Sequence, residues 1–164
     1  MKTPMAKKHA EKHADKQADA ALQLGNQICF AIYSTAHAFN RVYKPLLDRL
    51  GLTYPQYLAM LVLWEGDGVT VKEMGARLHL DSGTLTPLLK RLESAHLLKR
   101  ARSTEDERQV VISLTPQGQA LKERARAVPQ GIVAASACSV GELAAMRNEL
   151  VALRDRLNAA AGSD

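Results

Sequence analysis

The sequence predicts a mainly α-helical chain with a small β-hairpin, arranged as a winged helix-turn-helix with further helices at both ends. Apolar residues recur at spacings of three and four through most of the 164 residues, which is the period of amphipathic helices. Two short helical segments are joined by residues 80–82, as in a helix-turn-helix. Residues 97–102 and the β-branched run 109–114 then flank a polar turn, which indicates a hairpin.

Composition and charge argue against a membrane or secreted protein and favour a partner with negative charge. No apolar stretch approaches the roughly 20 residues that a membrane span needs, and the charged N-terminus lacks an apolar signal segment. We therefore expect a cytoplasmic protein with no membrane partner. The net charge of +5 favours a polyanionic partner without identifying one.

The N-terminal part is predicted to be a tail followed by a long helix. Residues 1–20 offer almost nothing to bury, which is typical of a disordered or loosely helical tail. Within it His9 and His13 lack a third metal ligand, so a solvated charged face is expected there. A helical pattern begins at about Leu22, and Pro45 is expected to kink or split it.

Capping residues predict where the later helices start. Thr53 is a candidate N-cap, Thr70 to Glu73 form a capping box, and Asp81 or Ser82 caps the second helix of the helix-turn-helix. Four leucines of that helix should face inward: Leu85, Leu88, Leu89 and Leu92.

The C-terminal third is predicted to hold two helices separated by a break. Thr115-Pro116 starts a helix that should run to about Val128, where Pro129-Gln130-Gly131 breaks it. Ser139 to Glu142 form another capping box. The last helix carries an apolar stripe that needs a partner helix, made of Leu143, Met146, Leu150, Leu153 and Leu157.

Basic side chains gather on the predicted hairpin and suit DNA phosphates. Lys99, Arg100 and Arg102 lie on its first strand, and Arg108 lies at or near its tip, where an arginine can enter a minor groove. A solvated surface is the alternative interpretation. Two more cations end the preceding helix, namely Lys90 and Arg91.

The second helix of the pair offers polar groups for reading bases or phosphates. Its exposed face carries Ser82, Thr84, Thr86 and Lys90. These residues are either DNA contacts or simply solvated. Asp106, two positions before Arg108, is a candidate to pair with that guanidinium and fix its aim, or else forms an ordinary surface pair.

These segments resemble the MarR family of winged-helix regulators. The likeness is carried by residues 88–93, 97–100 and 106–118, the last reading Asp-Glu-Arg-Gln-Val-Val-Ile-Ser-Leu-Thr-Pro-Gln-Gly, and it extends from about Leu22 to Leu157. The resemblance implies a homodimer whose first and last helices intertwine, with each subunit offering one winged helix to a palindromic operator.

The family pattern also implies how the chain is divided. Residues 21–160 would form a single domain, in which 21–52 and 116–160 are dimerisation helices and 53–115 are the winged helix-turn-helix DNA-binding region.

Within that family, the N-terminal third is similar to the organic hydroperoxide resistance regulators. The resemblance implies that Cys29 is a peroxide-reactive thiolate and that Tyr43 and Tyr54 donate hydrogen bonds to it. It also implies a two-cysteine type, in which Cys138 resolves the oxidised Cys29 of the other subunit as a disulfide. The matching segments are Asn26 to Ser34, Tyr43 to Leu47 and Leu52 to Tyr57.

Helix arithmetic constrains such a site. Cys29 and Tyr43 are 43 − 29 = 14 positions apart, which is about 21 Å along a continuous helix. If both serve one site, they must come from two subunits whose first helices run antiparallel. Tyr33, at i+4 from Cys29, is the nearest neighbour on the same face and could line the pocket.

The leading hypothesis is a transcriptional repressor that organic hydroperoxide releases from DNA by oxidising Cys29. The first alternative keeps the repressor but switches it with a phenolic or aromatic ligand in the dimer cleft, which Cys29 would then only line. A thiol peroxidase would explain the cysteines but not the wing, so we expect no enzyme. No cofactor or metal is expected, because His37, His79 and His96 are scattered.

Overall fold

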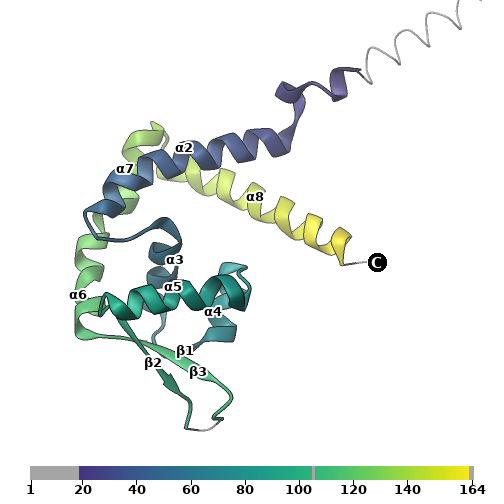
Figure 1. Ribbon diagram of the computed structural model, residues 1–164. Coiled ribbons are helices and arrows are strands. Elements are labelled where there is room, and N and C mark those ends of the chain that lie inside the picture. Colours follow the sequence, from purple (N-terminus) through teal and green to yellow (C-terminus); the bar gives the residue numbers. More distant parts are fainter. Residues whose placement is uncertain (1–18, 105, 163–164) are drawn as a thin grey trace, which may run out of the picture. The chain divides into compact units, whose positions relative to one another are not determined.

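The computed structural model describes residues 19–104 and 106–162 (Figure 1). The chain forms two compact units, of which the first ends at Arg41 and the second begins at Val42. Residues 1–18, which hold most of the predicted tail together with His9 and His13, lie outside the described residues. Among the described residues, no helix is long and apolar enough to cross a membrane.

The elements confirm a mainly helical chain with a small sheet. In chain order they are η1 (Leu24–Asn26), α2 (Ile28–Asp48), α3 (Tyr54–Glu65), β1 (Val69–Thr70), α4 (Val71–Leu78), α5 (Ser82–Ser94), β2 (Leu98–Arg102), β3 (Val110–Leu114), α6 (Pro116–Ala125), α7 (Ala127–Ser136) and α8 (Val140–Ala161).

The long first helix differs from its prediction at both ends. α2 begins at Ile28 instead of Leu22, because the single 3₁₀ turn η1 precedes it. The predicted split at Pro45 is wrong, since α2 continues through Pro45 to Asp48. Pro45 stands in the last turn of α2, where a missing backbone N–H removes one hydrogen bond near the helix end and not several in its middle.

The helix-turn-helix of α4 and α5 forms as its capping residues predict. The Glu73 backbone N–H donates to Thr70 Oγ1 at 3.1 Å, and the Glu73 carboxylate accepts from the Thr70 backbone N–H at 2.7 Å. Asp81, not Ser82, is the N-cap of α5, because its Oδ1 accepts from the Thr84 backbone N–H at 2.9 Å. All four inward-facing leucines of α5 are buried.

The wing is a three-stranded antiparallel sheet in the order β1-β3-β2, and the β2–β3 hairpin projects from the helices (Figure 1). Arg100 of β2 stands opposite Ile112 of β3, and Arg102 stands opposite Val110. β1 was not predicted. It contains two residues, and its partner β3 lies about 40 positions away, so no local pattern marks it.

The C-terminal helices correct one predicted boundary. α6 ends at Ala125, and α7 runs through Pro129 and Gly131 to Ser136, so the predicted break at 129–131 is wrong. Pro129 is the third residue of α7, where the backbone N–H has no partner within the helix in any case. Gly131 lies against Leu46, whose Cδ1 would come within 2.8 Å of an added Cβ.

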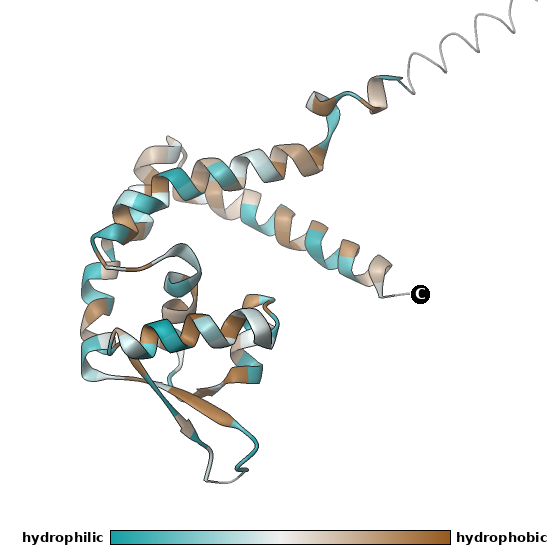
Figure 2. Ribbon diagram, viewed as in Figure 1, coloured by the Kyte–Doolittle hydropathy of each residue, from teal (hydrophilic) through white to brown (hydrophobic). Residues whose placement is uncertain are grey.

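The core lies in the second unit, between the helix-turn-helix, α3 and the sheet. Its largest buried side chains are Leu47, Met60, Leu63, Met74, Leu85, Leu89, Leu92, Leu98 and Ile112. By contrast, α8 has no buried residue, although apolar and polar side chains alternate along it (Figure 2). Met146, Leu150 and Leu157 of its predicted stripe are 45%, 49% and 60% exposed.

Candidate DNA interface and sensing site

The exposed face of α5 keeps its hydroxyls in hydrogen bonds. Thr84 Oγ1 donates to Asp81 Oδ2 at 3.0 Å, and Thr86 Oγ1 donates to the Ser82 carbonyl at 2.8 Å. Both hydroxyls therefore present lone pairs to an incoming partner. Thr84, Thr86, Ser82 and Lys90 are all exposed, as is Arg91.

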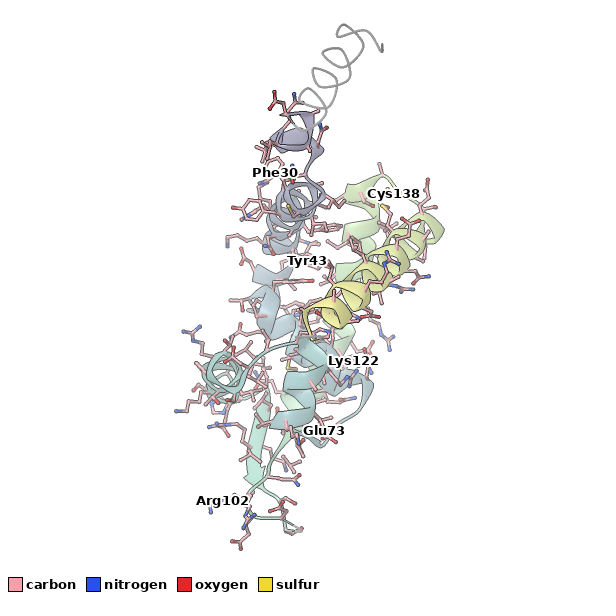
Figure 3. The ribbon with its side chains drawn as sticks, turned by 90° about the vertical axis from the view of Figure 1, so that its right-hand side faces the viewer. Phe30, Tyr43, Glu73, Arg102, Lys122 and Cys138 are labelled. Carbon is pink, nitrogen blue, oxygen red and sulfur yellow. The ribbon has the colours of Figure 1, made fainter. Side chains whose placement is uncertain are left out.

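The wing places two predicted cations in solvent. Arg102 ends β2 and its side chain extends from the wing (Figure 3), and Arg108 lies in the turn just before β3. Both residues are exposed. Among the described residues, no carboxylate lies within 4 Å of either guanidinium. Both guanidinium groups can therefore meet phosphate oxygens or enter a groove.

Asp106 has a different partner from the one predicted. Its Oδ1 accepts from the Arg108 backbone N–H at 3.0 Å, and its Oδ2 accepts from the Gln109 side-chain amide at 3.1 Å. The Ser103 backbone N–H donates to the Gln109 carbonyl at 2.9 Å and closes the hairpin. The predicted ion pair with the Arg108 guanidinium is absent from the described residues. Asp106 instead fixes the backbone from which Arg108 projects.

Arg100 differs from the other predicted DNA contacts because it turns inward. Its guanidinium donates to Glu93 Oε2 from Nε at 2.8 Å and from Nη2 at 2.6 Å. The Arg100 side chain is 26% exposed. The sequence pattern placed Arg100 with the solvent-facing cations and missed Glu93, seven positions earlier.

A groove of about 1040 Å³ lies between α4, α5 and the wing. Ser82 and Thr86 line it from α5, and Arg100, Arg108 and Gln109 line it from the β2–β3 hairpin. Two predicted DNA contacts of the helix, Ser82 and Thr86, thus share one groove with Arg100 and Arg108 of the hairpin.

The two tyrosines that the resemblance assigns to the sensing site, Tyr43 and Tyr54, have their rings close together, and Tyr57 lies near them. The rings of Tyr43 and Tyr54 have centroids 4.7 Å apart, and that of Tyr57 lies 6.2 Å from Tyr43. Burial, followed by the neighbouring Tyr54 and Tyr57, raises the pKa of Tyr43 to about 12. Burial also raises the pKa of Tyr54 and of Tyr57. All three phenols therefore keep their protons at neutral pH and can donate hydrogen bonds.

Tyr57 was not singled out from the sequence. It lies inside the matched segment 52–57, three positions after Tyr54 and on the same face of α3, so helical spacing was the available signal.

Cys29 is exposed on the first turn of α2. Tyr33 follows one turn later, with its ring centroid 6.4 Å from that of Phe30 and 4.4 Å from that of His37. Cys29 and Tyr43 lie on one helix, 14 positions apart, because α2 runs without a break from Ile28 to Asp48.

Cys138 is half-buried in the short connection between α7 and α8. Its Sγ lies 3.3 Å from the Ser136 carbonyl, to which the thiol donates. The next residue, Ser139, caps α8 by accepting from the Glu142 backbone N–H at 3.2 Å. Within residues 19–104 and 106–162, no group of three or more His, Cys, Asp and Glu side chains could hold a metal ion.

Comparisons with known proteins agree with the fold. The family of transcriptional regulators SarA/Rot matches residues 41–125. The regulator TtmR of Methylorubrum extorquens (strain PA1) is 51% identical over 140 residues, which cover 85% of this chain and 72% of TtmR. The organic hydroperoxide resistance transcriptional regulator of Bacillus subtilis (strain 168) is 50% identical over 137 residues, which cover 84% of this chain and 93% of that protein.

Solved structures of AbfR, a protein of Staphylococcus epidermidis, have the same fold. Reduced AbfR bound to DNA matches with a TM-score of 0.71 and 37% identity, over 87% of this chain and 99% of AbfR. Disulfide-formed AbfR matches with a TM-score of 0.60 and 37% identity, over 85% and 98% of the two chains. The resemblance drawn from the sequence is thus confirmed, and the relatives are regulators, not enzymes. The chain belongs to the SarA/Rot/MarR-type family of winged-helix transcriptional regulators.

Proposed function

We propose that this regulator is a homodimeric repressor that releases palindromic operator DNA when an organic hydroperoxide oxidises Cys29. The observation that carries the proposal is the exposed thiol of Cys29 in a chain 50% identical to an organic hydroperoxide resistance regulator. AbfR supports it, because solved structures of that protein include a reduced, DNA-bound state and a disulfide state.

Residues 53–115 carry the proposed DNA contacts. The exposed face of α5 enters the major groove, and the wing brings Arg108 to the adjacent minor groove. Lys90, Arg91 and Arg102 meet phosphates, which supply most of the affinity. Asp106 serves this contact indirectly, by holding the backbone of Arg108.

The dimer is proposed to form from residues 21–52 and 116–160. Exposed apolar side chains on both segments lack a covering partner within the described chain. Examples are Ile28 at 65%, Leu150 at 49% and Leu157 at 60% exposure. Burial of such side chains between two subunits is the usual source of association free energy. A sensing site across this interface also satisfies the helix arithmetic.

The sensing step begins with the Cys29 thiolate. Its sulfur attacks one peroxide oxygen, the O–O bond breaks, and the departing alkoxide takes up a proton to become an alcohol. Sulfur is oxidised to a sulfenic acid, and the peroxide is reduced. Tyr43 and Tyr54 of the partner subunit, both protonated at neutral pH, hydrogen-bond to the thiolate and favour the reactive form. Apolar side chains around Cys29, including Phe30 and Ile32, favour an organic peroxide.

Cys138 of the partner subunit is the proposed resolving thiol. It attacks the sulfenic sulfur of Cys29, water leaves, and an intersubunit disulfide forms. A covalent link between α2 of one subunit and the α7–α8 connection of the other would hold the two winged modules at a separation that no longer fits the operator.

Operator binding under different oxidants tests the sensing mechanism. A palindromic DNA is first selected from a random pool with the reduced protein. Cumene hydroperoxide should then release the wild type from this DNA but not Cys29→Ser, and hydrogen peroxide should act more weakly. Release of Cys29→Ser by cumene hydroperoxide would overturn the sensing role. Release of both proteins by salicylate alone would instead favour a non-covalent ligand switch.

The role of Cys138 has a separate test. After peroxide treatment, a non-reducing gel should show a reducible dimer for the wild type and none for Cys138→Ser. A cross-link that persists in Cys138→Ser would remove Cys138 from the mechanism.

A further inference from the structure

The Glu93 carboxylate links α5 to the wing. Glu93 lies in the last turn of α5 and Arg100 in the middle of β2. Glu93 Oε2 accepts two hydrogen bonds from the Arg100 guanidinium, at 2.6 and 2.8 Å, and Oε1 accepts one from the Arg100 backbone N–H at 3.1 Å. The carboxylate thus holds both the side chain and the backbone of the strand.

The Glu93–Arg100 pair is partly shielded from solvent. The Arg100 and Glu93 side chains are 26% and 36% exposed. Leu92 beside Glu93 is fully buried, and so is Ile112, which stands opposite Arg100 in the sheet. The hydrogen bonds from Arg100 lower the pKa of Glu93, so the carboxylate stays ionised at neutral pH. Two charge-assisted donors that converge on one carboxylate oxygen fix the orientation of the guanidinium as well as its distance.

Arg100 also lines the groove between α4, α5 and the wing, as does Arg108. Arg102 and Arg108 are exposed, whereas Arg100 is only partly exposed. The Nε and Nη2 groups of Arg100 donate to Glu93, and the Glu93 carboxylate offsets the positive charge that would otherwise attract a phosphate. Arg100 is therefore suited to holding the wing and poorly suited to meeting DNA.

We propose that Glu93 and Arg100 are positioning residues that set the wing relative to α5, so that both can engage adjacent grooves of one DNA site. This inference rests on the DNA binding proposed above and adds residues that do not touch DNA. It replaces Arg100 as a predicted DNA contact.

For the removal of the Glu93 charge, the proposal predicts a change in DNA affinity opposite to the one that charge alone predicts. Removing a negative charge from a DNA-binding surface should by itself strengthen binding to the polyanion. Glu93→Gln should nevertheless weaken operator binding, by roughly tenfold, because the wing loses its anchor.

Salt dependence distinguishes positioning from phosphate contact. Each phosphate contact contributes about 0.9 to the slope of log affinity against log salt. Arg100→Gln should weaken binding roughly tenfold with the slope unchanged. The control Arg102→Gln should lower the slope by about one.

The experiment uses reduced full-length protein and the selected palindromic DNA over a series of salt concentrations. Besides the single variants, the double variant Glu93→Gln/Arg100→Gln should bind no more weakly than either one, because all three remove the same pair. Footprinting should show that minor-groove protection at the wing is lost while major-groove protection remains. If circular dichroism shows that a glutamine variant does not fold, Arg100→Lys takes its place. Lysine keeps the charge but lacks the planar guanidinium, so Arg100→Lys should weaken binding with the same unchanged slope.

Three results would overturn the inference. The first is that Glu93→Gln binds the operator as tightly as the wild type or more tightly. The second is that the salt slope of Arg100→Gln or Arg100→Lys falls as it does for Arg102→Gln, and the third is that the losses of the two single variants add up in the double variant. If the wild type binds no DNA, the proposed function itself fails, and that outcome is separate from these three.

Discussion

The three clustered tyrosines show how a residue's surroundings decide its chemistry. Tyr43, Tyr54 and Tyr57 come from two helices, and burial raises the pKa of each phenol. A phenol that resists ionisation remains a donor over the whole physiological pH range. This property suits a group whose proposed task is to hydrogen-bond to a thiolate.

Replacing Tyr43 should change how stability depends on pH. The pKa of Tyr43 is about 12 in the folded protein and about 10 in an unfolded chain. A raised folded-state pKa gives stability that is complete below pH 10 and is lost as pH rises toward 12. In urea unfolding at pH 9 to 12, the free energy of unfolding should therefore fall less for Tyr43→Phe than for the wild type. Equal falls in both proteins would contradict the pKa assigned to Tyr43.

The cations of the hairpin show what the sequence could not reveal at this scale. Composition and spacing grouped Arg100 with Arg102 on the first strand and placed Arg108 at or near the wing tip, with all three expected to meet DNA. Only the fold brings Glu93 onto Arg100 and leaves the other two exposed. Tyr43 and Tyr54 were paired by family resemblance, because the packing of α2 on α3 that brings their rings together leaves no local sequence signal.

Among the elements, α6 is held against the rest of the second unit by two hydrogen bonds with Trp64 and by a close backbone approach at Gly118. Trp64 Nε1 donates to the Gly118 carbonyl at 3.0 Å, and Lys122 Nζ donates to the Trp64 carbonyl at 2.7 Å. An added Cβ on Gly118 would lie 1.9 Å from the Leu97 carbonyl oxygen. A glycine is required here by the close approach of two backbones.

Gly118→Ala should therefore destabilise the protein by about 3 kcal/mol, because α6 must move away from the backbone of Leu97. Thermal and urea unfolding measure this loss. Gly66→Ala is the matched control, since no atom lies within 4 Å of its added Cβ, and it should change stability by less than about 0.5 kcal/mol. Equal stabilities of the two variants would refute the close contact.

The start of α6 provides a second prediction. Thr115 Oγ1 accepts from the Gly118 backbone N–H at 3.0 Å and donates to the His96 carbonyl at 2.6 Å. Thr115→Ala should cost about 1–2 kcal/mol of unfolding free energy, and Thr115→Ser, which keeps the hydroxyl, should cost less. Denaturant unfolding of the two variants compares them. A serine variant as unstable as the alanine variant would show that the methyl group, not the hydroxyl, matters.

The sequence predicted most elements correctly where a capping residue marks their start. Thr70, Asp81, Thr115 and Ser139 all cap the helices assigned to them. The errors at Pro45 and Pro129 share one cause. A proline in the last or first turn removes few hydrogen bonds, so a helix tolerates it there, and composition alone does not show which turn a proline occupies.

At the scale of the whole molecule, the proposed dimer would bury the exposed apolar stripe of α8. Leu150→Glu combined with Leu157→Glu should make the protein monomeric, because two charges on the stripe oppose its burial. Light scattering after size-exclusion chromatography measures the mass, and operator binding should fall along with it. Asn148→Glu, on an exposed neighbouring position of α8, should remain dimeric. A dimeric double variant would place the interface elsewhere.

The arrangement of two subunits is the feature of the candidate site that the sequence of one chain predicts least. Helix spacing separates Cys29 from Tyr43 on one α2, so a site that uses both residues would need a second subunit. The spacing does not give the angle between two subunits. That angle depends on side-chain packing between copies, which no spacing rule in one chain contains.

The indole of Trp64, which donates to the Gly118 carbonyl, also gives the protein an intrinsic fluorescence signal. Trp64 is the only tryptophan in the chain, and it is 8% exposed between α3 and α6. Its fluorescence emission should therefore shift only when the second unit opens. Events confined to the first unit, around Cys29, should leave that emission unchanged. The emission of Trp64 can thus report unfolding of the second unit separately from chemistry at Cys29, without an added label.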